Sequence, residues 1–264
     1  MKRIRYFYLV ELQYLGFRYS GWQKQPGFKT IEGMLSKTLR FVLLNTKFKI
    51  IGSGRTDAKV SALQAACELF IEDEPLHDLK EFVKLFNENL PPDIKVIRIS
   101  EVDDKFNIIQ HPKEKEYIYL FSHGDKNHPF CAPFLANIVQ ELNIPLMQQA
   151  AKLFEGTHNF KAYTSRPRPN SQFVRTINTC ILKENAVVSA SFFPNQSYAL
   201  HVTGSGFMRY QIRMIMGALI QLGKGELTME TLKDSLMDDS SVQLNYVAPG
   251  SGLLLHRINF DTTS

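Results

Sequence analysis

Hydrophobic and polar residues alternate at the start of the chain and then change to a helical spacing. Alternation over residues 4–12 predicts a strand with at least one buried face. From Thr30 onward, apolar residues recur every three or four positions, which predicts a helix with Thr30 as its N-cap. Asp78 and Glu81 open a second predicted helix, which ends before Pro91. Apolar runs predict strands at 48–51 and 94–99, whereas the pattern over 60–71 fits a strand or a helix.

The second half of the chain shows a similar series of patterns. The charged residues 101–115 are interpreted as the crossing between halves, and a strand is predicted at 116–121. Residues 122–144 are predicted to be irregular, and 165–172 to form an exposed basic loop. Pro145 is expected as the first residue of a helix that Gly156 ends. Further strands are predicted at 174–182, 186–192, 198–203 and 254–260.

Two more helices are predicted near the end of the chain. Gly204-Ser205-Gly206 is expected to lead into a helix that carries Met208, with Arg209 and Arg213 four residues apart on one face. Thr228 is expected to cap a short helix after it. The first half then reads β-α-β-β-α-β, which is a ferredoxin-like order, and the second half roughly repeats it.

These elements predict an α+β protein with two ferredoxin-like (RRM-like) halves. We expect residues 1–104 to form the first half and 105–264 the second. Two such sheets placed edge to edge would make one extended antiparallel sheet with helices behind it.

Composition narrows the possible functions. No run of eighteen apolar residues occurs, so no membrane span is expected. Cys67, Cys131 and Cys180 are too few and too scattered for a zinc site or a disulfide framework, and they fit a reducing cytoplasm. The net charge of +5 and the pI of about 9.0 favour a polyanionic partner without establishing one.

The most informative stretch is Gly52-Ser53-Gly54-Arg55-Thr56-Asp57-Ala58. Its glycines predict a tight turn or a close approach of the backbone to another segment. If the stretch is locally extended, Arg55 and Asp57 project to the same side. A guanidinium beside a carboxylate favours the ionised, nucleophilic form of the acid. A solvated turn with an ordinary surface ion pair is the alternative.

Several motifs in order resemble the tRNA pseudouridine synthase A family over nearly the whole chain. Besides Gly54-Arg55-Thr56-Asp57-Ala58, they are Tyr14-Leu15-Gly16-Phe17, Gly21-Trp22-Gln23-Lys24-Gln25, Thr30-Ile31-Glu32, Leu90-Pro91-Pro92-Asp93-Ile94, Lys115-Glu116-Tyr117-Ile118-Tyr119, Gly156-Thr157-His158-Asn159-Phe160, Gly206-Phe207-Met208-Arg209-Tyr210-Gln211-Ile212-Arg213 and Pro249 with Gly252-Leu253-Leu254-Leu255. The resemblance also decides for a strand at 60–71.

The resemblance implies an isomerase that converts uridine to pseudouridine at positions 38, 39 and 40 of the tRNA anticodon stem-loop. It assigns the nucleophile to Asp57, base flipping to Arg55, stacking on uracil to Tyr117, pairing with Asp57 to Arg213 and an apolar wall to Leu253, in a cleft where the halves meet. The reaction exchanges a C1′–N1 bond for a C1′–C5 bond, so it needs no metal and no redox cofactor. A cytoplasmic homodimer is also implied.

Basic residues outside these motifs are candidates for phosphate contacts, although each alone is more commonly a solvated charge. They are Lys2, Arg3, Arg5, Lys24, Lys161, Arg166, Arg168 and Arg175. The chain departs from the family pattern at Lys59, Ser61 and Ile109, where glycine, histidine and arginine are usual, and at Asn159, where aspartate is common. The first three departures bear on the grip on RNA.

Other functions remain open from the residues. A non-catalytic RNA-binding module on the same scaffold is one alternative, although binding alone would not need an aspartate that faces a polyanion. A pseudouridine synthase with a different RNA target is another. An aspartyl-phosphate phosphatase is disfavoured, because its second aspartate would fall at Lys59.

Overall fold

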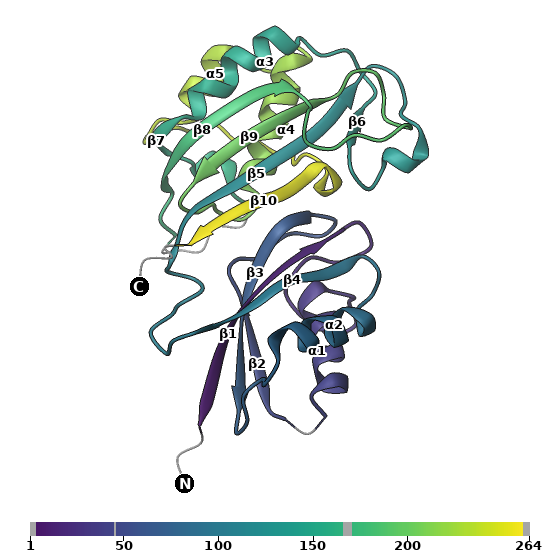
Figure 1. The fold of residues 1–264 in the computed structure, drawn as a ribbon. Coiled ribbons are helices and arrows are strands. Elements are labelled where there is room, and N and C mark those ends of the chain that lie inside the picture. Colours follow the sequence, from purple (N-terminus) through teal and green to yellow (C-terminus); the bar gives the residue numbers. More distant parts are fainter. Residues whose placement is uncertain (1–3, 45, 166–170, 261–264) are drawn as a thin grey trace. The chain divides into compact units, whose positions relative to one another are not determined.

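The computed structural model describes residues 4–44, 46–165 and 171–260 (Figure 1). The chain forms two compact units, one made of Met1–Lys113 and Leu255–Ser264 and the other of Glu114–Leu254. The domain boundary expected after residue 104 stays a prediction. Residues 166–170 of the expected basic loop, with Arg166 and Arg168, and the candidates Lys2 and Arg3 lie outside the described residues.

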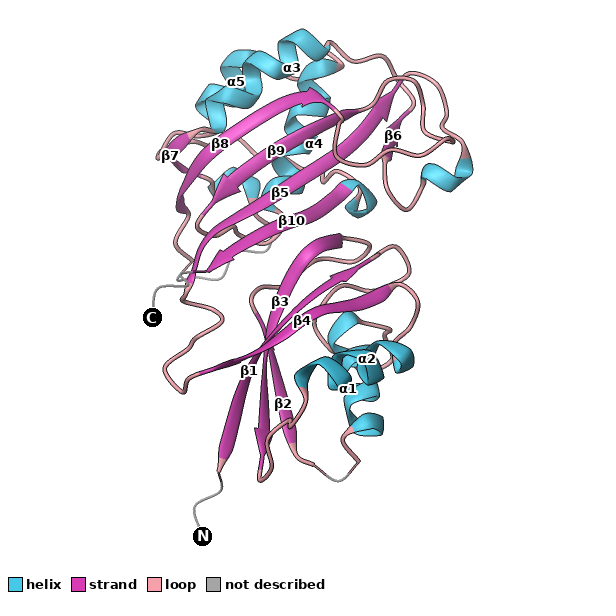
Figure 2. Ribbon diagram, viewed as in Figure 1, coloured by secondary structure: helices cyan, strands magenta, loops and turns pink. Residues whose placement is uncertain are grey.

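The first unit has the predicted β-α-β-β-α-β order. Its elements are β1 (Arg5–Tyr14), α1 (Ile31–Val42), β2 (Phe48–Gly52), β3 (Ser61–Glu72), α2 (Leu79–Asn89) and β4 (Ile94–Val102). The strands lie in the order β4-β1-β3-β2, and every neighbouring pair is antiparallel. The helices α1 and α2 lie side by side over this sheet, where α1 contacts β2 and α2 contacts β4 (Figure 2). This is a ferredoxin-like arrangement.

Local capping explains where the helices of the first unit begin. The Thr30 side chain accepts a hydrogen bond of 3.2 Å from the Gly33 amide, and Asp78 accepts from the amides of Lys80 and Glu81 at 3.0 Å. Both caps were predicted, because a short polar side chain can satisfy amides that have no partner within the helix.

The second unit begins with β5 (Pro112–His123), whose first two residues still belong to the first unit. The elements that follow are β6 (Ala136–Ile138), α3 (Ile144–Ala151), β7 (Gly156–Asn159), β8 (Val174–Glu184), β9 (Tyr198–Gly204), α4 (Gln211–Gly223) and α5 (Met229–Asp234). The strands run β5-β9-β8-β7 with antiparallel neighbours, and the short β6 pairs with β5 in parallel. The last strand, β10 (Leu253–Phe260), joins the first unit from Leu255 onward.

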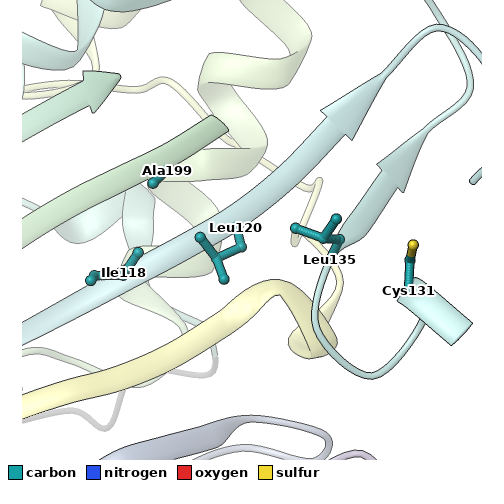
Figure 3. Packing of buried hydrophobic residues seen from close by; sticks show 5 residues of the cluster. All are labelled: Ile118, Leu120, Cys131, Leu135 and Ala199. Atoms are coloured by element: carbon teal, nitrogen blue, oxygen red, sulfur yellow. The ribbon is translucent and has the colours of Figure 1, made fainter. Parts of the chain in front are cut away.

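The strand predicted at 186–192 is wrong. The Asn185 side chain accepts hydrogen bonds from the amides of Val187 and Val188 at 2.9 and 3.4 Å and donates to the Val188 carbonyl at 2.8 Å. These hydrogen bonds to the Asn185 side chain occupy backbone amides and a carbonyl that would otherwise pair with a neighbouring strand. The apolar side chains of this segment instead pack on a buried cluster made of Ile118, Leu120, Cys131, Leu135 and Ala199 (Figure 3).

The start of α4 also differs from the prediction. Met208 and Arg209 lie before the helix, which begins at Gln211, so Arg209 does not share a helical face with Arg213. Tyr210 has a left-handed backbone with φ of 64°, and the Met208 amide donates to the Gln211 side chain at 2.8 Å. A left-handed residue interrupts a right-handed helix, and Gly204-Ser205-Gly206 is therefore not at the helix N-terminus.

The predicted start and end of α3 need correction too. Asn143 caps the helix by accepting from the Leu146 amide at 3.1 Å, which makes Pro145 its second residue. The α-helix ends at Ala151 and a 3-10 turn over Lys152–Phe154 follows, while Gly156 opens β7. Thr228, in contrast, caps α5 as predicted, with its side chain accepting from the Thr231 amide at 3.1 Å.

The α+β fold class predicted from the sequence is confirmed, with mainly antiparallel strand pairing and few helices in the described parts of both units. Among the residues that the structure describes, no helix is long and apolar enough to cross a membrane. Cys67, Cys131 and Cys180 are all buried and free.

Candidate functional site

Arg55 and Asp57 lie in the loop that joins β2 to β3 in the first unit. Arg55 is exposed and Asp57 is half-buried. The Asp57 carbonyl accepts a hydrogen bond of 3.2 Å from the Val60 amide, which closes a turn at the end of the loop. A carboxylate in this position is held on a short, turned segment and is still reached by solvent.

A second segment, residues 14–22, holds this loop in place. The Trp22 amide donates to the Thr56 carbonyl at 3.0 Å, and the Lys59 amide donates to the Tyr19 carbonyl at 3.0 Å. The Tyr14 hydroxyl lies 2.9 Å from the Thr56 hydroxyl. The loop is therefore tied on both sides of Asp57, which restricts the positions that the carboxylate can take.

Two glycines of the second segment allow this close approach. A Cβ on Gly16 would lie 1.8 Å from the Val60 carbonyl oxygen, and one on Gly21 would lie 2.5 Å from that of Thr56. Gly21 also has φ of +95°, which favours glycine. The backbone approach expected from the glycines near Asp57 thus involves glycines upstream of it as well.

The departures at Lys59 and Ser61 have structural explanations. Lys59 has φ of 66°, a left-handed conformation that suits the usual glycine better, and its Nζ lies 5.5 Å from the centre of the Phe17 ring. Ser61 is buried, and its hydroxyl accepts from the Gly16 amide at 2.9 Å. Ser61 therefore helps to join the two segments. Ile109 is exposed on a turn in which Asn107 accepts from its amide.

A polar cluster outside the loop holds the same segment. Arg18 forms a paired hydrogen bond with the Asp93 carboxylate, and the Tyr19 hydroxyl donates to it at 2.6 Å. Burial and then the bond to Asp93 raise the pKa of Tyr19 to about 12. Burial alone would raise the pKa of Asp93, but the hydrogen bonds from Arg18 and Tyr19 outweigh it and lower that pKa. Sequence reasoning had not assigned a role to Arg18 or Tyr19.

Tyr117 and Leu253 both belong to the second unit. Tyr117 is half-buried on β5 and packs edge to face against Phe207, with ring centres 5.4 Å apart. Leu253 is buried at the first position of β10. Tyr119 is fully buried, and its hydroxyl donates to the Pro249 carbonyl at 2.8 Å. Burial raises the pKa of Tyr119 well above its ordinary value, so its bound hydroxyl is a structural group and Tyr117 remains the better candidate for the site.

Arg213 lies in the first turn of α4 and is held by the segment before β10. Its Nε donates to the Ala248 carbonyl at 2.7 Å, while the Ala248 amide donates to the Arg213 carbonyl at 3.0 Å. The Tyr210 ring lies 5.0 Å from the Arg213 guanidinium and 4.9 Å from that of Arg209. Tyr210, missed in the sequence, thus combines a left-handed backbone with two cation-π contacts, and no short motif indicates that combination.

The structure therefore places Arg55 and Asp57 on one loop of the first unit, and Tyr117, Arg213 and Leu253 in the second unit. The described residues contain no group of three or more His, Cys, Asp or Glu side chains that could hold a metal ion. The arrangement of the loop suits a carboxylate that acts on a bound ligand, because its backbone is tied while its side chain is reached by solvent.

Comparison with known proteins finds one family model and several relatives that carry the same description. Residues 150–261 match the model of the family described as tRNA pseudouridine synthase. The chain is 33% identical over 256 residues to tRNA pseudouridine synthase A of Bacillus sp. (strain KSM-64), which covers 96% of this chain and 99% of that protein. It is 31% identical over 256 residues to tRNA pseudouridine synthase A 2 of Bacillus cereus (strain ATCC 14579), with the same coverage. The similar protein of Dictyoglomus thermophilum is 30% identical over 257 residues, or 95% of this chain and 98% of the relative.

Proposed function

Since the chain belongs to the tRNA pseudouridine synthase A family and is an isomerase that acts on tRNA, we propose a specific target and nucleophile for it. It converts uridine to pseudouridine at positions 38, 39 and 40 of the anticodon stem-loop, and Asp57 is the nucleophile. The observation that carries the proposal is the match to relatives named tRNA pseudouridine synthase A over 96% of the chain. The Asp57 loop supports it, since its backbone is tied at Thr56 and at Lys59.

The chemistry requires few protein groups. The C1′–N1 bond of the uridine breaks and a C1′–C5 bond forms, N1 gains a proton and C5 loses one, so no group leaves the nucleoside. In our proposal the Asp57 carboxylate starts this exchange by adding to uracil C6, by adding to ribose C1′, or by promoting elimination to a glycal. All three routes need the carboxylate to be ionised and fixed near the detached base.

Arg55 supports the proposed access to the target base. A uridine inside a stem is out of reach until it flips out of the helix, which costs a few kcal/mol. The Arg55 side chain is exposed two residues before Asp57, so its guanidinium can fill the vacated space or hold a phosphate. We propose that Tyr117 stacks on the uracil, that Leu253 supplies an apolar wall, and that Arg213 is the cation of the site.

The decisive experiment compares the natural chain with Asp57→Asn on unmodified tRNA transcripts. Pseudouridines are mapped by chemical adduct formation, and transcripts with cytidine at 38, 39 or 40 identify the site. We expect multiple turnovers by the natural chain and none by Asp57→Asn. Unchanged modification by the variant would remove Asp57 from the mechanism, and pseudouridine elsewhere would correct the target site.

The same assay separates the alternative of a non-catalytic RNA-binding module. Such a module would bind the transcripts yet form no pseudouridine at an enzyme concentration far below that of the tRNA. We also propose that the protein acts as a homodimer in the cytoplasm, in keeping with its three buried free cysteines and its tRNA substrate. Sedimentation with and without tRNA measures the oligomeric state.

A further inference from the structure

The first unit contains a hollow of about 890 Å³ between α1 and β2, away from the loop of Asp57. We call it the α1–β2 hollow. Twelve residues line it, among them five cationic side chains and two carboxylates. The cationic residues are Arg5, Lys24, Arg40, Lys47 and Lys49. The whole chain of 264 residues has a net charge of +5, so a large share of its excess positive charge is concentrated here.

Both carboxylates of the hollow already have partners. A Glu72 oxygen lies 3.5 Å from the Arg5 guanidinium, and a Glu32 oxygen accepts from the Lys24 main-chain amide at 2.9 Å. Within the described residues, the side chains of Lys24, Lys47 and Lys49 form no ion pair, and neither does Arg40. Like charges that share a concave surface repel one another, and a polyanion bound there would relieve that repulsion.

Aromatic side chains line the hollow beside these charges. Phe48 and Phe70 are half-buried, and they project from opposite faces of the β2–β3 pair. Phe70 is on the same face as Lys49, whose ammonium lies 5.8 Å from the centre of its ring. Cations beside aromatic faces are typical of surfaces that bind nucleic acid, where the charges contact phosphates and the rings contact bases or sugars. An acidic peptide would match the charge alone.

The hollow is connected to the catalytic loop through the chain itself. β2 provides Phe48 and Lys49 to the hollow and then runs directly into the loop of Asp57. Lys24 lies two residues after Trp22, whose amide donates a hydrogen bond to the Thr56 carbonyl in that loop. From Lys49 to Gly52 a strand extends only about 10 Å. An RNA bound at Asp57 is therefore long enough to reach the hollow as well.

We propose that the α1–β2 hollow binds phosphates of the tRNA substrate away from the uridine that Asp57 converts. The inference rests on the proposed function, and it adds a second contact region on the same unit. Because the contact is made to phosphates, it contributes affinity that does not depend on sequence and that weakens with salt.

The test uses the full chain and the triple variant Lys24→Gln/Lys47→Gln/Lys49→Gln. Fluorescence anisotropy gives the Kd for a tRNA transcript at several KCl concentrations, and pseudouridine formation gives KM and kcat. Each lysine that no longer neutralises a phosphate lowers the slope of log affinity against log salt by about 0.7 to 0.9, so the slope of the triple variant should fall by about two to three. We expect KM to rise tenfold or more with little change in kcat.

A matched control removes three exposed lysines elsewhere in the same unit, as Lys80→Gln/Lys95→Gln/Lys105→Gln. It has the same net charge as the test variant and should keep the Kd and salt slope within about twofold of the natural chain. Circular dichroism checks that both variants fold. Equal Kd and salt slope in the two variants would overturn the hollow as an RNA site.

Two further outcomes keep the proposals apart. If the natural chain forms no pseudouridine, the proposed function fails whatever the hollow binds. If the natural chain is active, and the triple variant loses binding of polyglutamate but not of tRNA, then the hollow takes an acidic peptide and this inference alone is wrong.

Discussion

The hydroxyl of Tyr14, at the end of β1, lies 2.9 Å from the hydroxyl of Thr56, one residue before Asp57. The two residues are 42 positions apart, and the contact ties a rigid strand to the loop that carries the carboxylate. The Thr56 carbonyl is fixed in addition by the Trp22 amide. The position of Asp57 thus depends on residues that precede it by more than thirty positions.

Tyr14→Phe should loosen this loop. Loss of one partly buried hydrogen bond costs about 1 kcal/mol of unfolding free energy, and a less restricted carboxylate should lower kcat about three- to tenfold. Urea unfolding and the rate of pseudouridine formation check both. Tyr6→Phe is the control, since the half-buried Tyr6 makes no side-chain hydrogen bond within the described residues. Equal losses in both variants would contradict the role given to Tyr14.

Lys59→Gly should stabilise the protein, because glycine adopts the observed φ of 66° without strain. The gain is partly offset by the greater freedom of glycine in the unfolded chain, so about 0.5 kcal/mol is expected. Lys59→Ala keeps the strain and removes the cation-π interaction with Phe17, and it should not stabilise. Urea titration ranks the three proteins. An alanine variant as stable as the glycine variant would contradict the strain.

Arg213→Lys should lower the modification rate about tenfold or more, although it keeps the charge. Lysine cannot reproduce the fixed guanidinium geometry that the Nε bond to the Ala248 carbonyl provides. Single-turnover assays at saturating tRNA measure the effect. Arg209→Lys is the control, because Arg209 is exposed and lies before the helix. A similar loss in both variants would show that the Ala248 contact is not what matters.

The cluster of Asp93, Arg18 and Tyr19 predicts that the stability of the folded protein falls at both acid and alkaline pH. The pKa of Asp93 is lowered in the folded protein, so its contribution to stability is present above the unfolded pKa of about 4 and is lost as pH falls through the folded value. The pKa of Tyr19 is raised to about 12, so its contribution is present below about pH 10 and is lost as pH rises through 12.

Asp93→Asn should therefore weaken the acid dependence of stability, and Tyr19→Phe should weaken the alkaline one. Thermal unfolding across pH 2–12 measures both. The Tyr19 hydroxyl donates a hydrogen bond to the Asp93 carboxylate, and this bond raises the pKa of Tyr19. Asp93→Asn should therefore also lower the pKa of Tyr19, which ultraviolet titration of tyrosine can follow. If the unfolding temperature of Asp93→Asn falls as steeply at acid pH as that of the natural chain, other carboxylates determine the acid dependence.

Local rules account for what could be predicted of the fold. The capping side chains of Thr30, Asp78 and Thr228 act on amides two or three residues away, so the sequence spacing contains the needed information. The segment after Asn185 alternates like a strand, but its hydrophobic side chains pack on a cluster formed by distant residues. Alternation shows which side chains are buried and not whether a neighbouring strand is there to pair.

The candidate site shows the same division. Asp57 and Arg55 could be named as candidates because the loop and its motif are contiguous in the sequence. The roles of Ser61 and Tyr210 could not, because one depends on a hydrogen bond to Gly16 and the other on a left-handed backbone between two arginines. The Ser61 contact joins segments 45 positions apart, and local preference does not indicate the Tyr210 backbone, because tyrosine rarely adopts a positive φ.

The fit of Gly16 and Gly21 against the carbonyls of Val60 and Thr56 also limits how the enzyme can be engineered. Residues 14–22 and 53–61 are distant in the sequence but pack together as one structural unit. A chimera that takes only one piece from a relative would bring together backbones shaped for different partners, whereas exchange of both pieces should transplant an intact Asp57 loop.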